Sequence, residues 1–410
     1  MKQYVIIGNG VAAVGAIEGI RSVDKEGKIT VVSEENHPVY CRPLISYYLE
    51  HKTDPERMNY RGTDFYDKMG CDVLYGKQVT GIDTNTKTVM IGDGTELAYT
   101  TVCVATGSAP FVPPFEGLET VENKFCFMTL DDTFALEKAI SKDSRVLVIG
   151  AGLIGLKCAE GLRDRVASIT VCDLADRVLS SILDTECAAM MQKHLETNGI
   201  RFILGDTAVR FDKNTATMKS GETVEFDVLV LAVGVRANTS LVKMLDGEVN
   251  RGIIVNDKME TSIPDIFAAG DCTEGHDISS GQKKVLAILP NAYMQGHTAG
   301  VNMAGGLEAF DQAVPMNSIG FFGLHAMTAG TYDGEIYEEK KENTWKQLFM
   351  KDGFLKGFIL IGRTERAGIY TSLIRERIPL DTIDWETMKV SATSVAFSQE
   401  KRRKMLGGVV

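Results

Sequence analysis

Short apolar runs and helical patterns alternate through most of the chain, beginning at the N-terminus. The clearest apolar run is Val146–Ile149, typical of a buried parallel strand, which is followed by a helical pattern and a second strand pattern at Ile169–Cys172. The first residues repeat this order, with a strand at Tyr4–Ile7, a helix that runs to about Val23 and a strand at Ile29–Val32. The pattern predicts two β-α-β units and therefore an α/β fold.

A glycine-rich turn joins strand to helix in each β-α-β unit. One turn is a G-x-G-x-x-G from Gly150 to Gly155, and the N-terminal one has Gly8 and Gly10, with Ala13 in the place of the third glycine. The first glycine permits a tight turn, the second lets a pyrophosphate approach the backbone, and the third lets the helix pack closely on the strand. The helix N-terminus then holds the phosphate charge. Two such turns predict two dinucleotides, most commonly NAD(P)H and FAD, and the alternative is a duplicated fold with one site lost.

Acidic residues follow the second strand of each unit. Asp173 lies 23 residues after Gly150, where a carboxylate accepts hydrogen bonds from a ribose 2′-OH. This carboxylate would repel the 2′-phosphate of NADPH, so NADH is favoured, although Arg177 is near enough in sequence to leave NADPH open. Glu34 and Glu35 follow the N-terminal unit.

Composition limits the class of protein. At 410 residues the chain is too long for one hydrophobic core, so two or three domains are expected. A net charge of −11 disfavours nucleic acid and anionic membrane surfaces, and no apolar run is long enough to span a bilayer. The eight cysteines form no C-x-x-C pair and the six histidines show no metal-ligand spacing, so no metal site is predicted. Cys103, Cys158 and Cys172 fall in apolar runs, which favours reduced core thiols and a cytoplasmic location.

The segment Val39–Ser46 reads Val-Tyr-Cys-Arg-Pro-Leu-Ile-Ser and resembles the FAD-dependent pyridine nucleotide-disulfide oxidoreductase superfamily. Within that superfamily it is most similar to NADH:rubredoxin oxidoreductases, ferredoxin reductases and the flavin domain of NADH-dependent nitrite reductases. The resemblance implies that Glu35, five residues before the Tyr-x-Arg-Pro segment, contacts the ribose of FAD. It also implies that Arg42 and Pro43 line the flavin.

Further family segments follow in the expected order. Thr101–Ser108 resembles the strand and Ala-Thr-Gly turn that leaves the FAD domain, and Leu229–Asn238 resembles the crossing back. Ile266–Asp271 resembles the Gly-Asp motif whose Asp contacts the ribityl chain, and Gln295–Gly300 resembles the helix that ends beneath the flavin ring. The FAD contacts that follow are Gly8, Gly10, Ala12, Ala13, Glu34, Glu35, Arg42, Pro43, Val79, Ala105, Thr106, Gly107, Gly270, Asp271, Gln295 and Gly296. The NAD contacts are Gly150, Gly152, Leu153, Ile154, Gly155, Asp173, Arg177, Ala232, Val233 and Gly234.

The resemblance also gives a domain plan of two Rossmann-like domains, of the glutathione-reductase type, and a small α+β domain. An FAD-binding domain of residues 1–111 and 237–312 contains an inserted NAD(P)H-binding domain of residues 112–236. Residues 313–410 form the C-terminal domain, which in the family closes over the flavin and often makes the dimer interface.

The C-terminal region shows its own pattern. Alternating runs predict antiparallel strands at Ile319–Phe322 and Phe354–Ile361, and Thr371–Arg375 is typical of a helix. The basic cluster Lys401–Lys404 is interpreted as the solvated end of a helix, and the alternative is a docking patch for an acidic electron carrier.

Position 157 departs from the family. Many relatives place a glutamate two residues after the third glycine and pair it with a lysine that follows the Arg-Pro-x-Leu-Ser segment near flavin N5. Here the first position is Lys157, and Tyr47 and Tyr48 follow Ser46 where the lysine is expected. We hypothesise that Lys157 is the cation near N5, where it would stabilise the anionic reduced flavin. The alternative is that Lys157 points into solvent.

Cys41 bears on the route of the electrons. Disulfide reductases of this superfamily carry a redox cysteine pair, and their NADH-oxidase and coenzyme-A-disulfide relatives use one cysteine close to this point. Pro43 occupies that place here, and Cys41 is expected in an extended segment rather than at a helix N-terminus that would lower its pKa. A structural role is therefore favoured for Cys41 and for Cys272, and electrons are expected to leave directly from the flavin.

The resemblance implies an enzyme that passes hydride from NADH to FAD and then electrons to a protein acceptor such as rubredoxin or a similar carrier. Three alternatives stay open. They are an NADH oxidase or peroxidase, an electron-input flavoprotein subunit of a larger complex, and a non-catalytic redox-responsive NAD-binding flavoprotein similar to apoptosis-inducing factors. The acceptor and the choice between monomer and homodimer are not encoded in any short motif.

Overall fold

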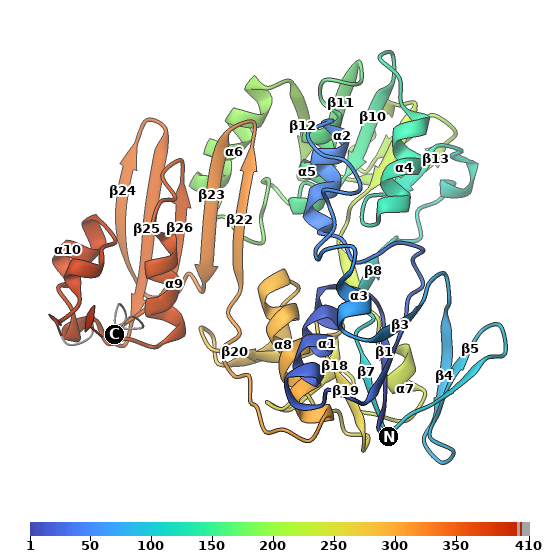
Figure 1. Ribbon diagram of the computed structural model, residues 1–410. Helices are drawn as coiled ribbons and strands as arrows, with labels where there is room; N and C mark the ends of the chain where they lie inside the picture. The colour runs from blue at the N-terminus through green and yellow to red at the C-terminus, as the bar shows by residue number, and fades with distance from the viewer. Residues whose placement is uncertain (400–401, 404–410) are drawn as a thin grey trace. The chain divides into compact units, whose positions relative to one another are not determined.

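The computed structural model describes residues 1–399 and 402–403, and the chain divides into two compact units (Figure 1). The large unit consists of residues 1–275 and 284–310, and the small unit consists of residues 276–283 and 311–410. Of the basic cluster expected at the C-terminus, Lys401 and Lys404 lie outside the described residues.

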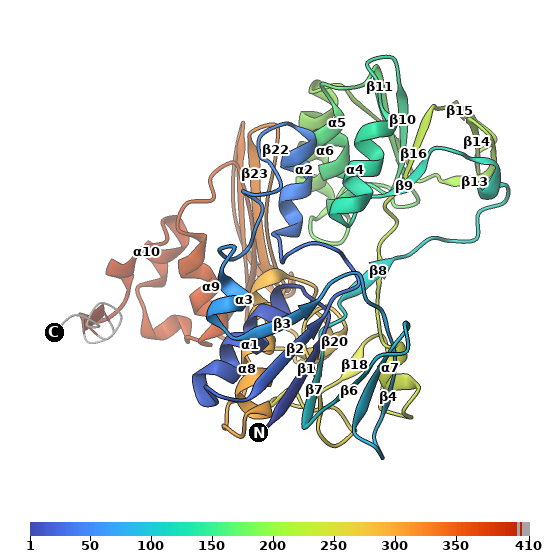
Figure 2. The same ribbon diagram turned by 45° about the vertical axis from the view of Figure 1, so that its right-hand side comes forward.

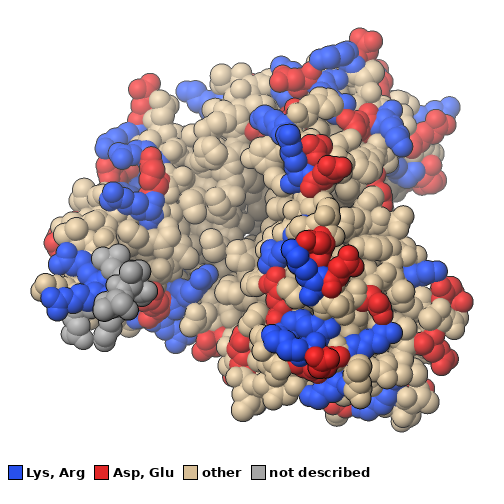
Figure 3. Space-filling model, viewed as in Figure 1, with Lys and Arg blue, Asp and Glu red and all other residues tan. Residues whose placement is uncertain are grey.

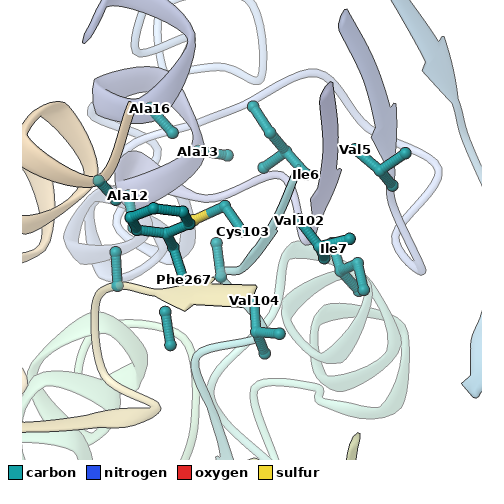
Figure 4. Close-up of a cluster of buried hydrophobic side chains, with 14 of the residues drawn as sticks. Val5, Ile6, Ile7, Ala12, Ala13, Ala16, Val102, Cys103, Val104 and Phe267 are labelled. Atoms are coloured by element: carbon teal, nitrogen blue, oxygen red, sulfur yellow. The ribbon is translucent and has the colours of Figure 1, made fainter. Parts of the chain in front are cut away.

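The first sheet of the large unit is built around the N-terminal strand. Its five strands are all parallel, in the order β19-β7-β1-β2-β3. Four of the five residues of β1 are buried, because a parallel sheet is covered on both faces. Figure 4 shows this core, with Phe267 beside Ala12 and Cys103. The strands are β1 (Gln3–Ile7), β2 (Lys28–Val32), β3 (Cys71–Leu74), β7 (Thr101–Val104) and β19 (Ile266–Ala268).

The second sheet of the large unit repeats this plan. Its five parallel strands lie in the order β12-β11-β10-β16-β9, with the strand that enters the glycine turn again in the middle. The predicted β-α-β units are therefore confirmed. The strands are β9 (Lys124–Cys126), β10 (Arg145–Ile149), β11 (Ser168–Asp173), β12 (Ile200–Leu204) and β16 (Val228–Leu231), and the helices of this part are α4 (Leu130–Ala139), α5 (Leu153–Leu162) and α6 (Thr185–Thr197).

Two three-stranded antiparallel sheets, which the sequence pattern did not predict, lie in the chain just before β7 and β16 (Figure 2). Their strands are short and largely half-exposed, so the alternation of apolar and polar residues is weak. They are β4 (Val79–Asp83), β5 (Thr88–Ile91) and β6 (Glu96–Ala98), and β13 (Ala208–Asp212), β14 (Thr215–Met218) and β15 (Thr223–Glu225).

The two segments predicted to connect the FAD-binding and NAD(P)H-binding domains run side by side. β8 (Ser108–Pro110) and β17 (Val235–Ala237) pair in an antiparallel ribbon. Just before β8, the Thr106 hydroxyl donates to the carbonyl oxygen of Asn238 at 3.0 Å, and the Asn238 side-chain amide donates to the Thr106 carbonyl at 2.8 Å. The remaining short helices of the large unit are α2 (Ile45–Leu49), α3 (Phe65–Lys68) and α7 (Ser240–Lys243).

Helices α1 (Val11–Val23) and α8 (Leu289–Met303) lie side by side with their backbones in contact (Figure 1). A Cβ on Gly296 would lie 2.0 Å from the carbonyl oxygen of Ala12, and one on Gly300 would lie 2.1 Å from that of Ala16. Glycines of α1 face α8 in the same way, since a Cβ on Gly19 would lie 2.2 Å from the carbonyl oxygen of His297. Only glycine fits at these positions.

The small unit contains a five-stranded antiparallel sheet in the order β22-β23-β26-β25-β24. Its core includes Phe358 and Leu373 and also Ile278, which is supplied by the tip of a hairpin between β20 and β21. The elements of the small unit are β22 (Met316–Phe321), β23 (Leu324–Gly330), β24 (Glu335–Lys341), β25 (Thr344–Lys351), β26 (Phe354–Ile361), α9 (Ala367–Arg375) and α10 (Trp385–Val390). The hairpin strands β20 (Thr273–Asp277) and β21 (Gln282–Val285) have their outer residues in the large unit, where β18 (Ile253–Ile254) pairs with Thr273 and Glu274 of β20.

Two parallel sheets with helices and a separate antiparallel sheet confirm the predicted fold class, with two Rossmann-like domains and a small α+β domain. The limits between the FAD-binding and NAD(P)H-binding domains stay a prediction. On the face shown in Figure 3, basic and acidic side chains are interspersed.

We expect Gly300→Ala to destabilise the protein by about 1–3 kcal/mol, because the new methyl group meets the backbone of α1. The matched control is Gly368→Ala in α9, where a Cβ would meet no atom within 4 Å. That change should raise stability by about 0.5–1 kcal/mol, since alanine favours the helix. Urea unfolding of both variants checks this. A Gly300 variant as stable as the native chain would contradict the backbone contact.

Candidate functional site

The N-terminal glycine turn holds a helix N-terminus open. Gly8 has φ +107°, and a Cβ there would lie 2.2 Å from the carbonyl oxygen of Ala105, so β1 and the turn after β7 meet backbone to backbone. Gly10 caps α1 without a side-chain hydrogen bond, and a Cβ on it would meet nothing within 4 Å. Open space in front of unpaired helix amides suits a phosphate group.

The second glycine turn has the same geometry. Gly150 has φ +115°, and a Cβ there would lie 2.2 Å from the carbonyl oxygen of Ala232. Gly152 caps α5 with open space around it. Gly155 allows close packing, because its Cβ would lie 2.0 Å from the carbonyl oxygen of Gly150. The predicted roles of the three glycines are therefore compatible with the structure.

The two acids after β2 are in different situations. Glu35 forms an ion pair with Arg42 and accepts a hydrogen bond from the Tyr40 hydroxyl at 2.7 Å. Glu34 is exposed, and its carboxylate has no hydrogen bond or ion pair within the described residues. Either carboxylate can bind the hydroxyls of a ribose, but Glu35 also fixes Arg42.

Val79, another predicted FAD contact, is half-buried at the start of β4.

Arg42 faces the Gly-Asp motif. Burial raises the pKa of the Asp271 carboxyl, and the positive charge of Arg42 opposes that rise. Within the described part of the chain, the Asp271 side chain has no hydrogen bond. A carboxylate in this state is suited to accept hydrogen bonds from ligand hydroxyls, as the resemblance implies for the ribityl chain of FAD.

Asn291, near the start of α8, is a candidate that the sequence analysis missed. It is 1% exposed, and neither its side-chain oxygen nor its nitrogen has a hydrogen-bond partner among the described residues. Leaving both atoms of a buried amide unpaired is costly, so this side chain is a candidate ligand contact. The only sequence signal is an Asn directly after Pro290, four residues before Gln295.

Gln295 and Gly296, both predicted FAD contacts, have structural partners. The Gln295 side-chain oxygen accepts from the Gly270 amide at 2.8 Å and from the Thr273 hydroxyl at 3.2 Å, so it holds the Gly-Asp turn in place. Gly296 packs against Ala12, as described above. A direct contact of either residue with FAD stays a prediction.

Asp173, the acidic residue predicted to bind the ribose at the second turn, is held by amides of the neighbouring loops. The Asp173 carboxylate accepts from the Ala151 amide at 2.6 Å and from the Ala175 amide at 2.8 Å. A carboxylate has about four acceptor sites, so two are left for ribose hydroxyls. Arg177 pairs with Asp176 at 2.9 Å, while its Nε is buried and has no hydrogen-bond partner in the described part of the chain.

Lys157 lies beside Tyr47. Figures 1 and 2 both show α2 beside α5. The Lys157 ammonium lies 5.0 Å from the centre of the Tyr47 ring and forms an ion pair with Glu160. The Lys157 side chain is 16% exposed, so the alternative that it points into solvent is wrong. Lys52 lies 5.8 Å from the same ring.

The segment that carries Arg42 also binds the part of the chain around α4. Arg42 donates to the carbonyl oxygen of Met128 at 3.0 Å, and the Leu130 amide donates to the Tyr40 hydroxyl at 2.9 Å. His37 contacts Asp131 at 2.8 Å. The predicted flavin-lining segment is therefore attached to residues of the predicted NAD(P)H-binding domain.

Cys41 is not an activated thiol. Burial raises its pKa, against a lowering by the Leu44 amide. Its backbone is extended, as expected, but it directly precedes one turn of 3-10 helix, Arg42–Leu44, which was not expected. Cys272 is fully buried with a raised pKa. All eight cysteines are free.

A search of the described residues finds no group of three or more side chains that could hold a metal ion. Within the same residues, no helix combines the length and apolar character needed to cross a membrane.

Comparison with known proteins extends this picture. A family model described as pyridine nucleotide-disulphide oxidoreductase matches residues 2–296. The chain is 32% identical over 391 residues to the NADH-dependent phenylglyoxylate dehydrogenase subunit epsilon of Aromatoleum evansii, with 92% of each chain covered. It is 31% identical to the nitrite reductase [NAD(P)H] of Bacillus subtilis over 95% of its own length, but spans only 49% of that protein.

Among solved structures, the covalent putidaredoxin reductase–putidaredoxin complex contains a chain with a TM-score of 0.88 and 23% identity, and the match covers 100% of this chain and 99% of that one. This likeness bears on the fold alone. The family model, by contrast, covers more than half of the chain and includes both glycine turns and the Gly-Asp motif. The chain therefore belongs to the pyridine nucleotide-disulphide oxidoreductase family and is an oxidoreductase.

Proposed function

We propose that this protein oxidises NADH, reduces FAD and delivers electrons to a protein acceptor. The observation that carries the proposal is the matched pair of turns, in which Gly10 and Gly152 each leave a helix N-terminus open. One open turn would suffice for a one-cofactor dehydrogenase. Two in one chain fit a donor nucleotide and a flavin nucleotide.

The first turn fits FAD. The open end of α1 has room for a pyrophosphate, and Asp271 and Asn291 present side chains that form no hydrogen bond with the described residues. Arg42, held by Glu35, supplies a fixed cation opposite Asp271. When bound, FAD supplies a ring that accepts hydride and gives up electrons. The chain itself positions the two cofactors.

At the second turn the chain favours NADH. The Asp173 carboxylate is anchored by two backbone amides at the end of β11, where it can bind ribose hydroxyls and repel a 2′-phosphate. The unpartnered Nε of Arg177 is the feature that would favour NADPH. Because the negative charge of Asp173 repels the 2′-phosphate of NADPH, we propose NADH as the donor nucleotide.

The acceptor is proposed to be a protein. Cys41 has a raised pKa, so a thiol relay is disfavoured and electrons leave from the flavin. The free cysteines fit a reducing, cytoplasmic location. The proposal includes a homodimer, since members of the family often pair through the C-terminal domain.

A second candidate function is that of an electron-input subunit in a larger enzyme. It is favoured by the match over 92% of both chains to a protein named as a subunit of an NADH-dependent dehydrogenase. On this reading the acceptor is a partner subunit, and the isolated chain reduces free carriers poorly.

Anaerobic mixing of the flavin-loaded protein with NADH should bleach the flavin absorbance within the first turnover. NADPH should bleach it about tenfold more slowly, because Asp173 repels the 2′-phosphate. Reoxidation should be fast with rubredoxin and slow in air. Fast reoxidation by air alone would favour an NADH oxidase, and absence of bleaching would contradict the proposal. Bleaching followed by slow reoxidation with either acceptor would favour the subunit reading.

The assignment of the two turns is tested by Gly10→Ala and Gly152→Ala. Neither new methyl group meets a protein atom, so each variant should fold and lose only the room for phosphate. The first should be isolated with little FAD. The second should retain FAD but bind NADH about tenfold more weakly or worse. Absorbance of the purified proteins and NADH titration measure both. The same loss of FAD from both variants would refute the assignment.

We propose that Lys157 raises the potential of the bound flavin. Lys157→Ala should then lower the midpoint potential by roughly 20–60 mV, equivalent to about 1–3 kcal/mol for two electrons. The matched control is Lys52→Ala, because Lys52 contacts the same Tyr47 ring but is 59% exposed. Its potential should stay within about 10 mV of the native value, owing to solvent screening. A spectroelectrochemical titration that shows no shift for Lys157→Ala would exclude the role.

A further inference from the structure

The small unit contains a cavity of about 410 Å³ that the proposed electron transfer does not use. Its volume lies in the range of small-molecule sites. Three segments form it: the tip of the β20–β21 hairpin, the first residues of β26 and the end of α9. The lining residues are Ile278, Ser279, Ser280, Gly281, Phe354, Leu355, Lys356, Ile374 and Arg377.

The walls of the cavity are largely apolar, and its two cations form no ion pair with the described residues, although Lys356 lies 5.8 Å from the centre of the Phe354 ring. Ile278, Leu355 and Ile374 are buried members of the small unit's core. Neither Lys356 nor Arg377 forms an ion pair or side-chain hydrogen bond within the described residues. The small unit holds 15 Lys and Arg against 14 Asp and Glu, whereas the whole chain has 44 against 55. Two unpaired cations beside apolar walls suit an anion with an apolar body.

The backbone of Arg377 is the second observation. The Arg377 amide bonds to the Ile374 carbonyl at 3.2 Å, and the Ile378 amide bonds to the Leu373 carbonyl at 3.0 Å. This pattern ends α9 in a Schellman motif, with Arg377 at φ +47° in the left-handed position that glycine usually fills. An arginine there carries backbone strain that glycine would avoid.

The hairpin tip is held firmly. The carboxylate of Asp277, which is fully buried, accepts from the Ser279 amide at 2.9 Å and from the Ser279 and Ser280 hydroxyls at 2.7 Å each. These bonds satisfy the carboxylate that precedes the lining residues of the hairpin. The turn therefore gives the cavity a fixed side.

We propose that this cavity binds a small organic monocarboxylate with an apolar chain or ring. The carboxylate pairs with the guanidinium of Arg377 and the ammonium of Lys356, and the apolar body lies against Ile278, Leu355 and Ile374. A guanidinium binds a carboxylate through two parallel hydrogen bonds, which selects this anion by shape as well as charge.

Calorimetric titration of the purified full-length chain with hexanoate tests the site. Hexanoate should bind, while hexanamide, which lacks the charge, and acetate, which lacks the chain, should each bind at least about tenfold more weakly. Arg377→Gln and Lys356→Gln should each weaken hexanoate binding about tenfold. The matched control, Lys351→Gln, removes a charge that is already paired with Asp333 and should leave the affinity unchanged.

Arg377→Gly separates a binding role from a structural one. Glycine fits the left-handed position, so this variant should melt at or above the native temperature and still lose hexanoate binding about tenfold. Equal binding of hexanoate and hexanamide, or unchanged hexanoate affinity in both Gln variants, would overturn the proposal. A lower melting temperature for Arg377→Gly with unchanged affinity would assign Arg377 to the end of α9 and overturn it as well.

Discussion

Close approach of backbone to backbone at Gly8 and Gly150 is the constraint on which the large unit depends. Each glycine lies against a carbonyl oxygen of a neighbouring turn, at Ala105 and at Ala232, where no side chain can be accommodated. This contact ends the central strand and starts the helix at a fixed point in each sheet. The helix amides then open toward space that protein does not fill, and the site is a consequence of that geometry.

The two halves of the large unit are joined through a small charged network. Arg42 is held by the Glu35 carboxylate on one side and by the Met128 carbonyl on the other, and Tyr40 bonds to both Glu35 and the Leu130 amide. A residue predicted to line the flavin is thus positioned by both nucleotide-binding parts. Under the proposed function, hydride transfer requires reacting atoms to lie within about 3–3.5 Å, so these bonds would contribute to the joint position of the two cofactors.

The sequence predicted the features that follow from local steric rules and missed those that depend on partners far along the chain. The glycine turns, the central strands and the fold class follow from spacing and periodicity. The sheets β4–β6 and β13–β15 were missed, because short half-exposed strands alternate weakly. Asn291 gives no motif, and the carbonyl partner of Arg42 is a backbone atom that no residue type reveals. Burial of Lys157 could not be read from the sequence, because it depends on how α5 packs beside α2.

The hairpin between β20 and β21 has a consequence for the order in which the protein is made. Its tip supplies Ile278 to a core whose other members include Leu355 and Ile374, which follow 77 and 96 residues later. At roughly 5–20 residues per second, a ribosome needs on the order of 5–20 s to add them. During that interval Ile278 lacks the core into which it packs. A chain shortened to residue 310 would leave Ile278 without that core, so the tip of the hairpin depends on the small unit.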